Sequence, residues 1–226
     1  MKLNIQELLD FFDDRKNSEK GDANAIISIL GEDLNVAAYK HFRNNKVEIP
    51  DESVLCGSKK GNRLDRWILD NENKRLFQCE IKNWAATAIG GKRLRSDADI
   101  SSTNKVVEYH KNHELPRNFS KTSIHPNGVT KVLVKMWPPA RIDNTLTIEP
   151  ILIYWMPISF GKDPLWPLSD ISVKSLDLPV KTEFTKLHIF SVSLYLRHLY
   201  RNGEKHINLD MPHFEHRMKL LDSFKG

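Results

Sequence analysis

The chain has 226 residues, of which 40% are apolar and 28% carry charge. These proportions are typical of a soluble globular protein and exclude a disordered chain, and the length suits one substantial core. No stretch approaches the roughly 20 apolar residues of a membrane span, and the acidic start MKLNIQELLDFFDDRK has no signal-peptide run. We therefore expect a single domain over residues 1–226, located in the cytoplasm, with Cys56 and Cys79 both reduced.

The net charge of +5 mildly favours a polyanionic partner. The basic residues gather in two clusters: Lys59, Lys60 and Arg63, and Lys92, Arg93 and Arg95. A basic cluster can form a solvated surface or contact phosphate groups, and charge alone does not decide between the two.

The first 45 residues have a helical pattern. Residues 3–14 form a short amphipathic segment, and residues 22–44 form a longer one whose apolar side chains recur every three or four positions. We expect the second helix to pack against the core through this stripe, which comprises Ile26, Leu30, Leu34, Ala37 and His41.

A hairpin is predicted after the polar passage that follows these helices. Residues 63–69 and 74–81 have the composition of strands, and the DNEN sequence between them is typical of a turn. A loop at residues 83–99 then leads to a predicted helix at 101–113, with Ser101 or Ser102 as its N-cap.

The second half of the chain adds strands to the predicted sheet. After a connection at residues 115–128, runs rich in β-branched and aromatic residues predict strands at 131–137, 145–158 and 186–192. A surface excursion is expected at 161–179, and helices at 193–200 and 212–224, the last starting near Pro212. The expected fold is α/β (α+β), with a central mixed β-sheet of four or more strands flanked by helices.

Three charged residues stand out within the predicted hairpin. Because side chains alternate between the faces of a strand, Glu80 and Lys82 share one face, and the hairpin can bring Asp65 beside them. Charges among apolar strand neighbours are costly to bury unless they pair or bind a metal ion. Two carboxylates can hold Mg²⁺, and a nearby lysine can orient an attacking water or stabilise charge on phosphorus.

Asp65 and the later Glu80-Ile81-Lys82 resemble the D…(D/E)xK signature of the restriction-endonuclease-like, or PD-(D/E)xK, nucleases. The resemblance covers residues 22–137, with additional strands and C-terminal helices in 138–226. It implies a restriction-endonuclease-like core, in which a helix precedes a mixed sheet and another helix precedes a later strand. Glu32 matches the glutamate that many members carry on the first helix. Leu64 replaces the usual proline, and no Gln-x-x-x-Tyr follows Lys82.

The resemblance also implies a function, namely hydrolysis of DNA phosphodiester bonds by an endonuclease that uses Mg²⁺, or Mn²⁺ as a substitute. Asp65, Glu80 and Glu32 would be metal ligands, and Lys82 would orient water or stabilise charge. We expect DNA contacts from the two basic clusters and base stacking by Trp84. A homodimer or a larger complex is expected as well, because one such site cuts one strand.

Two other interpretations remain open at this stage. The chain could keep the nuclease fold as a non-catalytic subunit that binds nucleic acid or protein. Alternatively, Asp65 could pair with Arg63 or Arg66 while Glu80 and Lys82 form a surface charge pair on an exposed strand. The spacing of His110 with His113, and of His213 with His216 downstream of His206, is also compatible with zinc but lacks a third well-spaced ligand.

Overall fold

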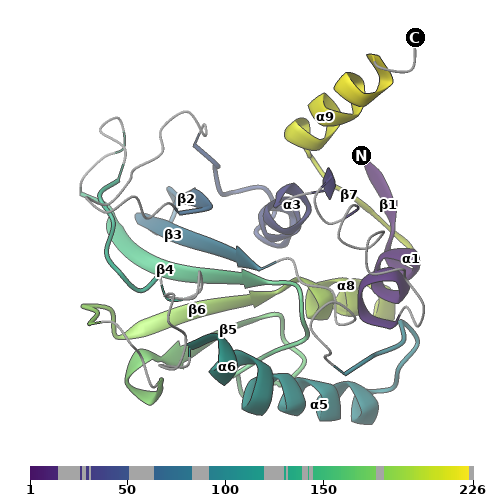
Figure 1. Cartoon of the computed structure of the whole chain (residues 1–226), viewed down its shortest axis with the longest axis horizontal. Coiled ribbons are helices and arrows are strands. Elements are labelled where there is room, and N and C mark those ends of the chain that lie inside the picture. Colours follow the sequence, from purple (N-terminus) through teal and green to yellow (C-terminus); the bar gives the residue numbers. More distant parts are fainter. Residues whose placement is uncertain are drawn as a thin grey trace.

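The computed structural model describes residues 1–14, 26, 29–30, 32–50, 64–82, 92–119, 130, 132–138, 142, 145–176 and 181–223. Its centre is a five-stranded mixed sheet with helices on both faces (Figure 1). The strand order is β2-β3-β4-β6-β5, formed by β2 (Arg66–Asp70), β3 (Arg75–Lys82), β4 (Thr147–Tyr154), β6 (Lys186–Ser191) and β5 (Leu168–Ser172). The expected mixed sheet of four or more strands is confirmed.

The predicted hairpin is also confirmed, with each strand shifted slightly along the sequence. β2 and β3 pair antiparallel from Arg66 opposite Cys79 to Asp70 opposite Arg75. Lys74, the last turn residue, has a positive φ of 52°. The Asp70 carboxylate closes this turn by accepting hydrogen bonds from the backbone and side-chain amides of Asn73.

The other strand pairs require long connections. β4 runs parallel to β3 on one side and to β6 on the other, and β5 is antiparallel to β6. Pro150 lies in β4 one position before the pairing with β6 begins at Ile151, so its missing N–H interrupts no ladder on that side. Parallel strands cannot be joined by a tight turn, and the chain between β3 and β4 accordingly includes helices.

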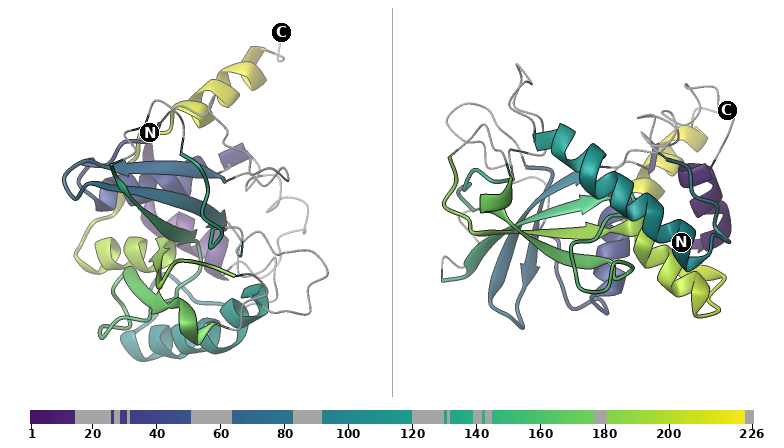
Figure 2. Two further views of the ribbon diagram at one scale, coloured as in Figure 1. Left: turned by 90° about the vertical axis from the view of Figure 1, so that its left-hand side faces the viewer. Right: turned by 90° about the horizontal axis from the view of Figure 1, so that it is seen from below.

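Helices cover the two faces of the sheet. On one side lie α1 (Ile5–Leu9) with its π-helical continuation η1 (Asp10–Asp14), α3 (Asp33–Phe42) and α8 (Val192–Arg201). On the other side α5 (Ile100–Tyr109) continues through η2 (His110–Glu114) into α6 (Leu115–Phe119), and Figure 2 shows this helix crossing the sheet. A short 3-10 turn, η3 (Val173–Ser175), follows β5.

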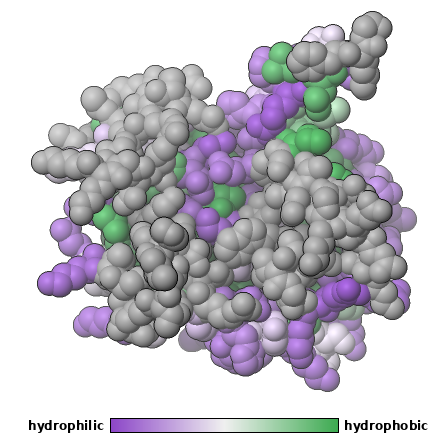
Figure 3. Space-filling model, viewed as in Figure 1, coloured by the Kyte–Doolittle hydropathy of each residue, from purple (hydrophilic) through white to green (hydrophobic). Residues whose placement is uncertain are grey.

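The chain ends come together outside the main sheet. β1 (Lys2–Asn4) pairs antiparallel with β7 (His206–Asn208) in a separate two-stranded sheet. α9 (Pro212–Ser223) then projects from the body (Figure 1), and Figure 3 shows hydrophobic residues along it. Leu220 and Leu221 of this helix are exposed. Pro212 starts this helix as predicted. The expected homodimer or larger complex stays a prediction. None of the helices in the described ranges is long and apolar enough to cross a membrane.

The helical stripe predicted in residues 22–44 does face the core. Leu30, Leu34 and Ala37 are buried in the cluster formed with the underside of β3 and β4, and Ile26 packs against it. His41 is bound by the Tyr195 hydroxyl, with 2.6 Å between His41 Nδ1 and the oxygen. Within residues 22–44, α3 covers Asp33–Phe42, and residues 22–25, 27–28 and 31 lie outside the described residues.

Several boundary predictions were wrong. Asp99, not Ser101 or Ser102, caps α5 by accepting a hydrogen bond from the Ser102 amide at 2.6 Å. The connection predicted at 115–128 begins with helix α6, and the excursion predicted at 161–179 contains strand β5. The first helix, predicted from residue 3, begins at Ile5 because β1 precedes it.

The predicted strand at 131–137 was wrong for a specific reason. Its described residues form a turn followed by an extended segment that belongs to neither sheet. The buried side chain of Gln78 takes the place of a neighbouring strand, since its amide donates to the carbonyls of Val132 and Val134. It also accepts a hydrogen bond from the backbone N–H of Met136 at 3.1 Å.

Candidate functional site

The register of the hairpin sets the position of the predicted triad. Arg66 of β2 pairs with Cys79 of β3, so Asp65 lies one position beyond this pair and directly across from Glu80. Glu80 and Lys82 share a face of β3 because they are two residues apart. The register thus places Asp65 beside the stretch of β3 that carries Glu80 and Lys82, at the end of the hairpin away from the turn.

Each member of this group has a defined contact. The Lys82 ammonium lies 2.5 Å from Glu80 Oε1, and Asp65 Oδ2 accepts the Ile81 backbone N–H at 2.7 Å. The Glu80 side chain is 2% exposed and that of Lys82 is 14% exposed. The interpretation of Glu80 and Lys82 as a pair on an exposed strand is therefore wrong, because the carboxylate is buried.

The carboxyl end of β3 is fixed by its neighbour β4. Lys82 lies opposite Tyr154 in the parallel ladder, and its carbonyl accepts a hydrogen bond from the Trp155 backbone N–H at 2.9 Å. Trp155 is fully buried just beyond β4. The backbone that carries Lys82 is thus held in place by the strand next to it.

Glu32 lies at the start of α3 and is directed to β2 through Arg66. Glu32 Oε2 lies 2.9 Å from the Arg66 guanidinium, which also donates to the backbone carbonyl of Asp65 at 2.6 Å. Asp33 contacts the same guanidinium at 3.6 Å and binds Arg217 of α9 at 2.6 Å. The structure therefore connects Glu32 with the triad through Arg66, a residue that the sequence argument had placed only as a partner for Asp65.

Cys79 reports on the electrostatics of this end of the hairpin. Burial raises the pKa of its thiol well above the ordinary value, and the negative charges of Asp65, Glu80 and Glu32 raise it further. The positive charge of Arg66 acts in the opposite direction. The negative charges of all three predicted acidic residues thus raise the pKa of the same buried thiol, which stays protonated at neutral pH.

The residue types of the site fit a hard divalent cation, because Mg²⁺ prefers carboxylate oxygen ligands. In this arrangement each carboxylate contacts a protein group: Asp65 the Ile81 amide, Glu80 the Lys82 ammonium and Glu32 the Arg66 guanidinium. The second oxygen of Glu80, Oε2, is buried and forms no hydrogen bond with the described residues. Among the described residues, no three or more His, Cys, Asp or Glu side chains are grouped to hold a metal ion. The histidine spacings considered for zinc likewise form no such group in that part of the chain.

The second basic cluster lies on the loop that precedes α5. Lys92, Arg93 and Arg95 are exposed, and the Lys92 ammonium sits 5.1 Å from the centroid of the Tyr109 ring. Asp97 orients Arg95 through two hydrogen bonds of 3.0 Å. The other predicted DNA-contacting residues, Lys59, Lys60, Arg63 and Trp84, lie outside the described residues.

Sequence reasoning missed a buried polar network next to this loop. Asp13 forms an ion pair with Arg197 at 2.8 Å and accepts hydrogen bonds from the Trp155 indole and the Ser193 hydroxyl. No sequence pattern connects these residues, because Asp13 and Arg197 are separated by 184 positions. The only available signal was a pair of charged residues on the apolar faces of two predicted helices.

Comparisons of the chain with family models, with curated proteins and with solved structures find no match.

Proposed function

We propose that this protein is a metal-dependent DNA endonuclease that hydrolyses phosphodiester bonds at the end of the β2–β3 hairpin. The observation that carries the proposal is the placement of Asp65 across from Glu80, with Lys82 on the same face and 2.5 Å from the Glu80 carboxylate. DNA is named as the substrate because of the resemblance to the PD-(D/E)xK nucleases.

The element order supports the same proposal. Helix α3 is followed by a bridge at Glu48 that pairs antiparallel with Leu69, then by the β2–β3 hairpin. Helices α5 and α6 next lead to β4, which is parallel to β3. This is the order that the resemblance implies, a helix before a mixed sheet and a helix before a later strand, with Asp65 directly before β2 and Glu80 in the neighbouring strand β3.

The proposed roles follow from the chemistry of each side chain. Asp65 and Glu80 would hold the cation, with Glu32 available from α3, and the bound metal would neutralise phosphate charge and activate water. Lys82 is placed to orient the attacking water or to stabilise negative charge that develops on the phosphate. Arg66 keeps Glu32 and the backbone of Asp65 together at the edge of the sheet.

One specific observation favours a second candidate, a non-catalytic subunit that keeps the nuclease fold. Protein groups bind all three acidic side chains, and Glu32 is directed to Arg66. Such a protein would bind nucleic acid or another protein without cleavage. The two candidates differ in whether a divalent cation produces cleavage.

The test is incubation of the purified protein with supercoiled plasmid and Mg²⁺ or Mn²⁺, alongside EDTA and the Lys82→Ala variant. The matched control is Lys46→Ala, because Lys46 forms a 2.9 Å ion pair with Glu72 at the turn end of the same hairpin. We expect nicking by the wild type and by Lys46→Ala, and none with EDTA or with Lys82→Ala. Cleavage that persists in Lys82→Ala, or no cleavage with either metal, would contradict the proposal.

A further inference from the structure

The loop that carries the second basic cluster is held by a buried arginine. We call residues 92–96 the basic segment. Arg197 of α8 is 1% exposed, and its guanidinium donates to the carbonyls of Leu94 at 2.8 Å and Arg95 at 2.6 Å. Asp13 binds the same guanidinium at 2.8 Å, and its own carbonyl accepts the Leu94 N–H at 3.1 Å. The backbone of the basic segment is therefore fixed from two sides.

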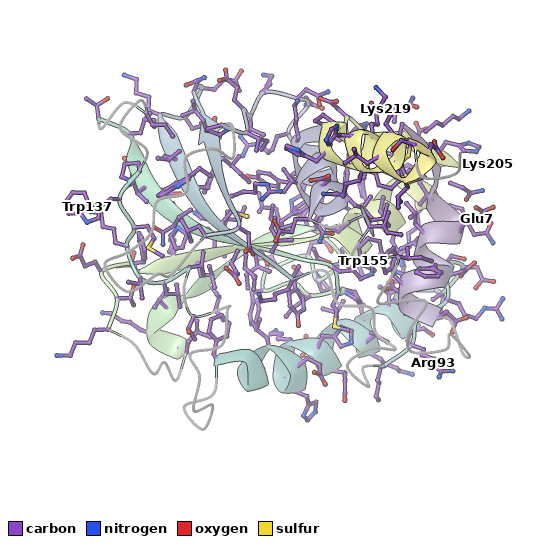
Figure 4. All side chains as sticks on the ribbon, turned by 45° about the horizontal axis from the view of Figure 1, so that its top comes forward. Glu7, Arg93, Trp137, Trp155, Lys205 and Lys219 are labelled. Atoms are coloured by element: carbon purple, nitrogen blue, oxygen red, sulfur yellow. The ribbon has the colours of Figure 1, made fainter. Side chains whose placement is uncertain are left out.

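This anchoring turns the cations of the basic segment outward. Leu94 and Ser96 are buried, and the Ser96 N–H donates to the Asp10 carboxylate at 3.0 Å. The residues between and before them are exposed, and Figure 4 shows Arg93 at the rim of the molecule, pointing away from its body. The segment thus presents its positive charges on a backbone that is not free to move.

The same network reaches the candidate site. Trp155 donates its backbone N–H to the Lys82 carbonyl at 2.9 Å and its indole N–H to Asp13 Oδ1 at 2.8 Å. Figure 4 shows Trp155 deep between the sheet and the N-terminal helix. One chain of contacts, from Lys82 through Trp155 and Asp13 to Arg197, therefore joins the end of β3 to the basic segment.

The chemistry of the Arg197 side chain indicates that its contacts fix the position of the basic segment's backbone. A buried ion pair is weak evidence for stability, since apolar residues of similar volume often serve a core equally well. The planar guanidinium instead offers several donors in a fixed fork, and here they reach two adjacent carbonyls and Asp13 at once. A lysine could pair with Asp13, but its single ammonium could not reproduce this arrangement.

We propose that Arg197 is a positioning residue, which holds the basic segment in a fixed relation to Lys82 so that its cations contact the phosphates of the bound strand. The partner is the phosphate backbone of a nucleic acid, and the inference rests on the proposed function. Arg197 acts only through the segment, so it has no effect of its own once the segment's cations are removed.

The test is a double-mutant cycle on DNA binding, measured by fluorescence anisotropy in EDTA with a duplex of about 30 base pairs at several salt concentrations. We expect Lys92→Ala/Arg93→Ala/Arg95→Ala to weaken binding about tenfold or more and to reduce the salt slope by about 3. Arg197→Lys should weaken binding severalfold, and its combination with Lys92→Ala/Arg93→Ala/Arg95→Ala should bind no more weakly than that triple variant alone. The matched control is Arg43→Lys, which alters another ion pair, with Asp70 at 2.8 Å, and should leave binding unchanged.

A second measurement separates positioning from general stability. In Arg197→Lys the amide hydrogens of Leu94 and Ser96 should exchange faster, while those of β3 should not. Should Arg197→Lys fail to fold, Asp10→Ala releases only the Ser96 amide and should weaken DNA binding to a smaller extent.

Specific outcomes would overturn this inference. One is unchanged DNA binding in both Arg197→Lys and Asp10→Ala. Another is a loss of DNA affinity in the combined variant that equals the sum of the losses in the separate variants. Wild-type protein that does not bind DNA would overturn it as well. If the binding results are as expected but the plasmid is not cut with Mg²⁺ or Mn²⁺, the proposed function fails and the positioning role stands.

Discussion

The two ends of the β2–β3 hairpin each contain a buried carboxylate beside a cation, but their contacts differ. At the turn end, Asp70 forms an ion pair at 2.8 Å with Arg43, which directly follows α3, and it also accepts hydrogen bonds from Asn73. The ion pair joins the hairpin to α3, and the hydrogen bonds from Asn73 close the turn. At the other end, the cation of Glu80 comes from Lys82 of the same strand.

The comparison indicates which pair the fold requires. An ion pair between residues of one strand adds no tertiary connection, yet Glu80 is as deeply buried as Asp70. Burying a charge costs free energy that the contact alone rarely recovers. We therefore expect the Asp70 pair to stabilise the hairpin, whereas the proposed function assigns the Glu80–Lys82 pair to catalysis.

The largest expected effect separates the charge of Asp65 from its hydrogen bond. Asp65→Asn keeps an oxygen that can accept the Ile81 N–H but removes the negative charge. We expect the initial rate of plasmid cleavage to fall about 100-fold or more, because the proposed function makes Asp65 a metal ligand. The free energy of unfolding in urea should change by less than about 1 kcal/mol. A variant that cuts at the wild-type rate would contradict the assignment of Asp65.

The turn end should respond in the opposite way. Asp70→Ala leaves Arg43 and the turn amide of Asn73 without their acceptor, so we expect the free energy of unfolding to fall by about 3 kcal/mol. The rate of cleavage below the unfolding transition should stay near that of the wild type. Urea unfolding and the plasmid assay measure the two quantities. An Asp70→Ala variant that is as stable as the wild type but does not cleave DNA would contradict the assignment of Asp70 to stability.

A smaller effect is expected from pH. Burial opposes the ionisation of Asp70, but hydrogen bonds from Asn73 and the charge of Arg43 outweigh it and lower the pKa below 3.8. Because the pKa is lower in the folded protein, the stabilisation is present above about pH 4 and is lost as the pH falls through the folded value. Unfolding free energies measured from about pH 6 to about pH 3 should therefore decline less steeply in Asp70→Asn. Parallel curves would contradict this origin of the decline.

The smallest expected change concerns Cys79. Its thiol is buried, and burial together with the nearby carboxylates raises its pKa, so the reactive thiolate is scarce. In a Cys56→Ser background at neutral pH, iodoacetamide should modify the native protein at least about 100-fold more slowly than the urea-unfolded protein. Mass spectrometry of timed samples measures this ratio. Equal modification rates in native and unfolded protein would contradict the burial of Cys79.

Local patterns made much of the hairpin predictable. The DNEN turn between two strand-like runs indicated antiparallel pairing, and the two-residue period placed Glu80 and Lys82 on one face. The opposition of Asp65 and Glu80 then followed from the geometry of a hairpin. The stripe of residues 22–44 was similarly informative, because burial at a helical period depends on nearby positions in the sequence.

Other features depended on contacts between distant residues. Gln78 binds backbone groups 54 to 58 positions away, and this contact replaces the strand that the β-branched run at 131–137 had indicated. β5 forms in a segment with a turn-like composition because the edge of β6 pairs with it. The ion pair of Asp13 with Arg197 spans 184 positions, so the sequence showed a charge on the apolar face of each helix but not that the two residues pair.

The central claim is that the Glu80–Lys82 pair serves the site and not the fold. Its most direct test is the free energy of urea unfolding of Glu80→Gln/Lys82→Met, which replaces the buried charges with neutral side chains of similar size. We predict a value equal to or above that of the wild type, because the variant removes both charges of the pair together. A loss of about 3 kcal/mol, like that expected for Asp70→Ala, would contradict the claim and assign the pair to the fold.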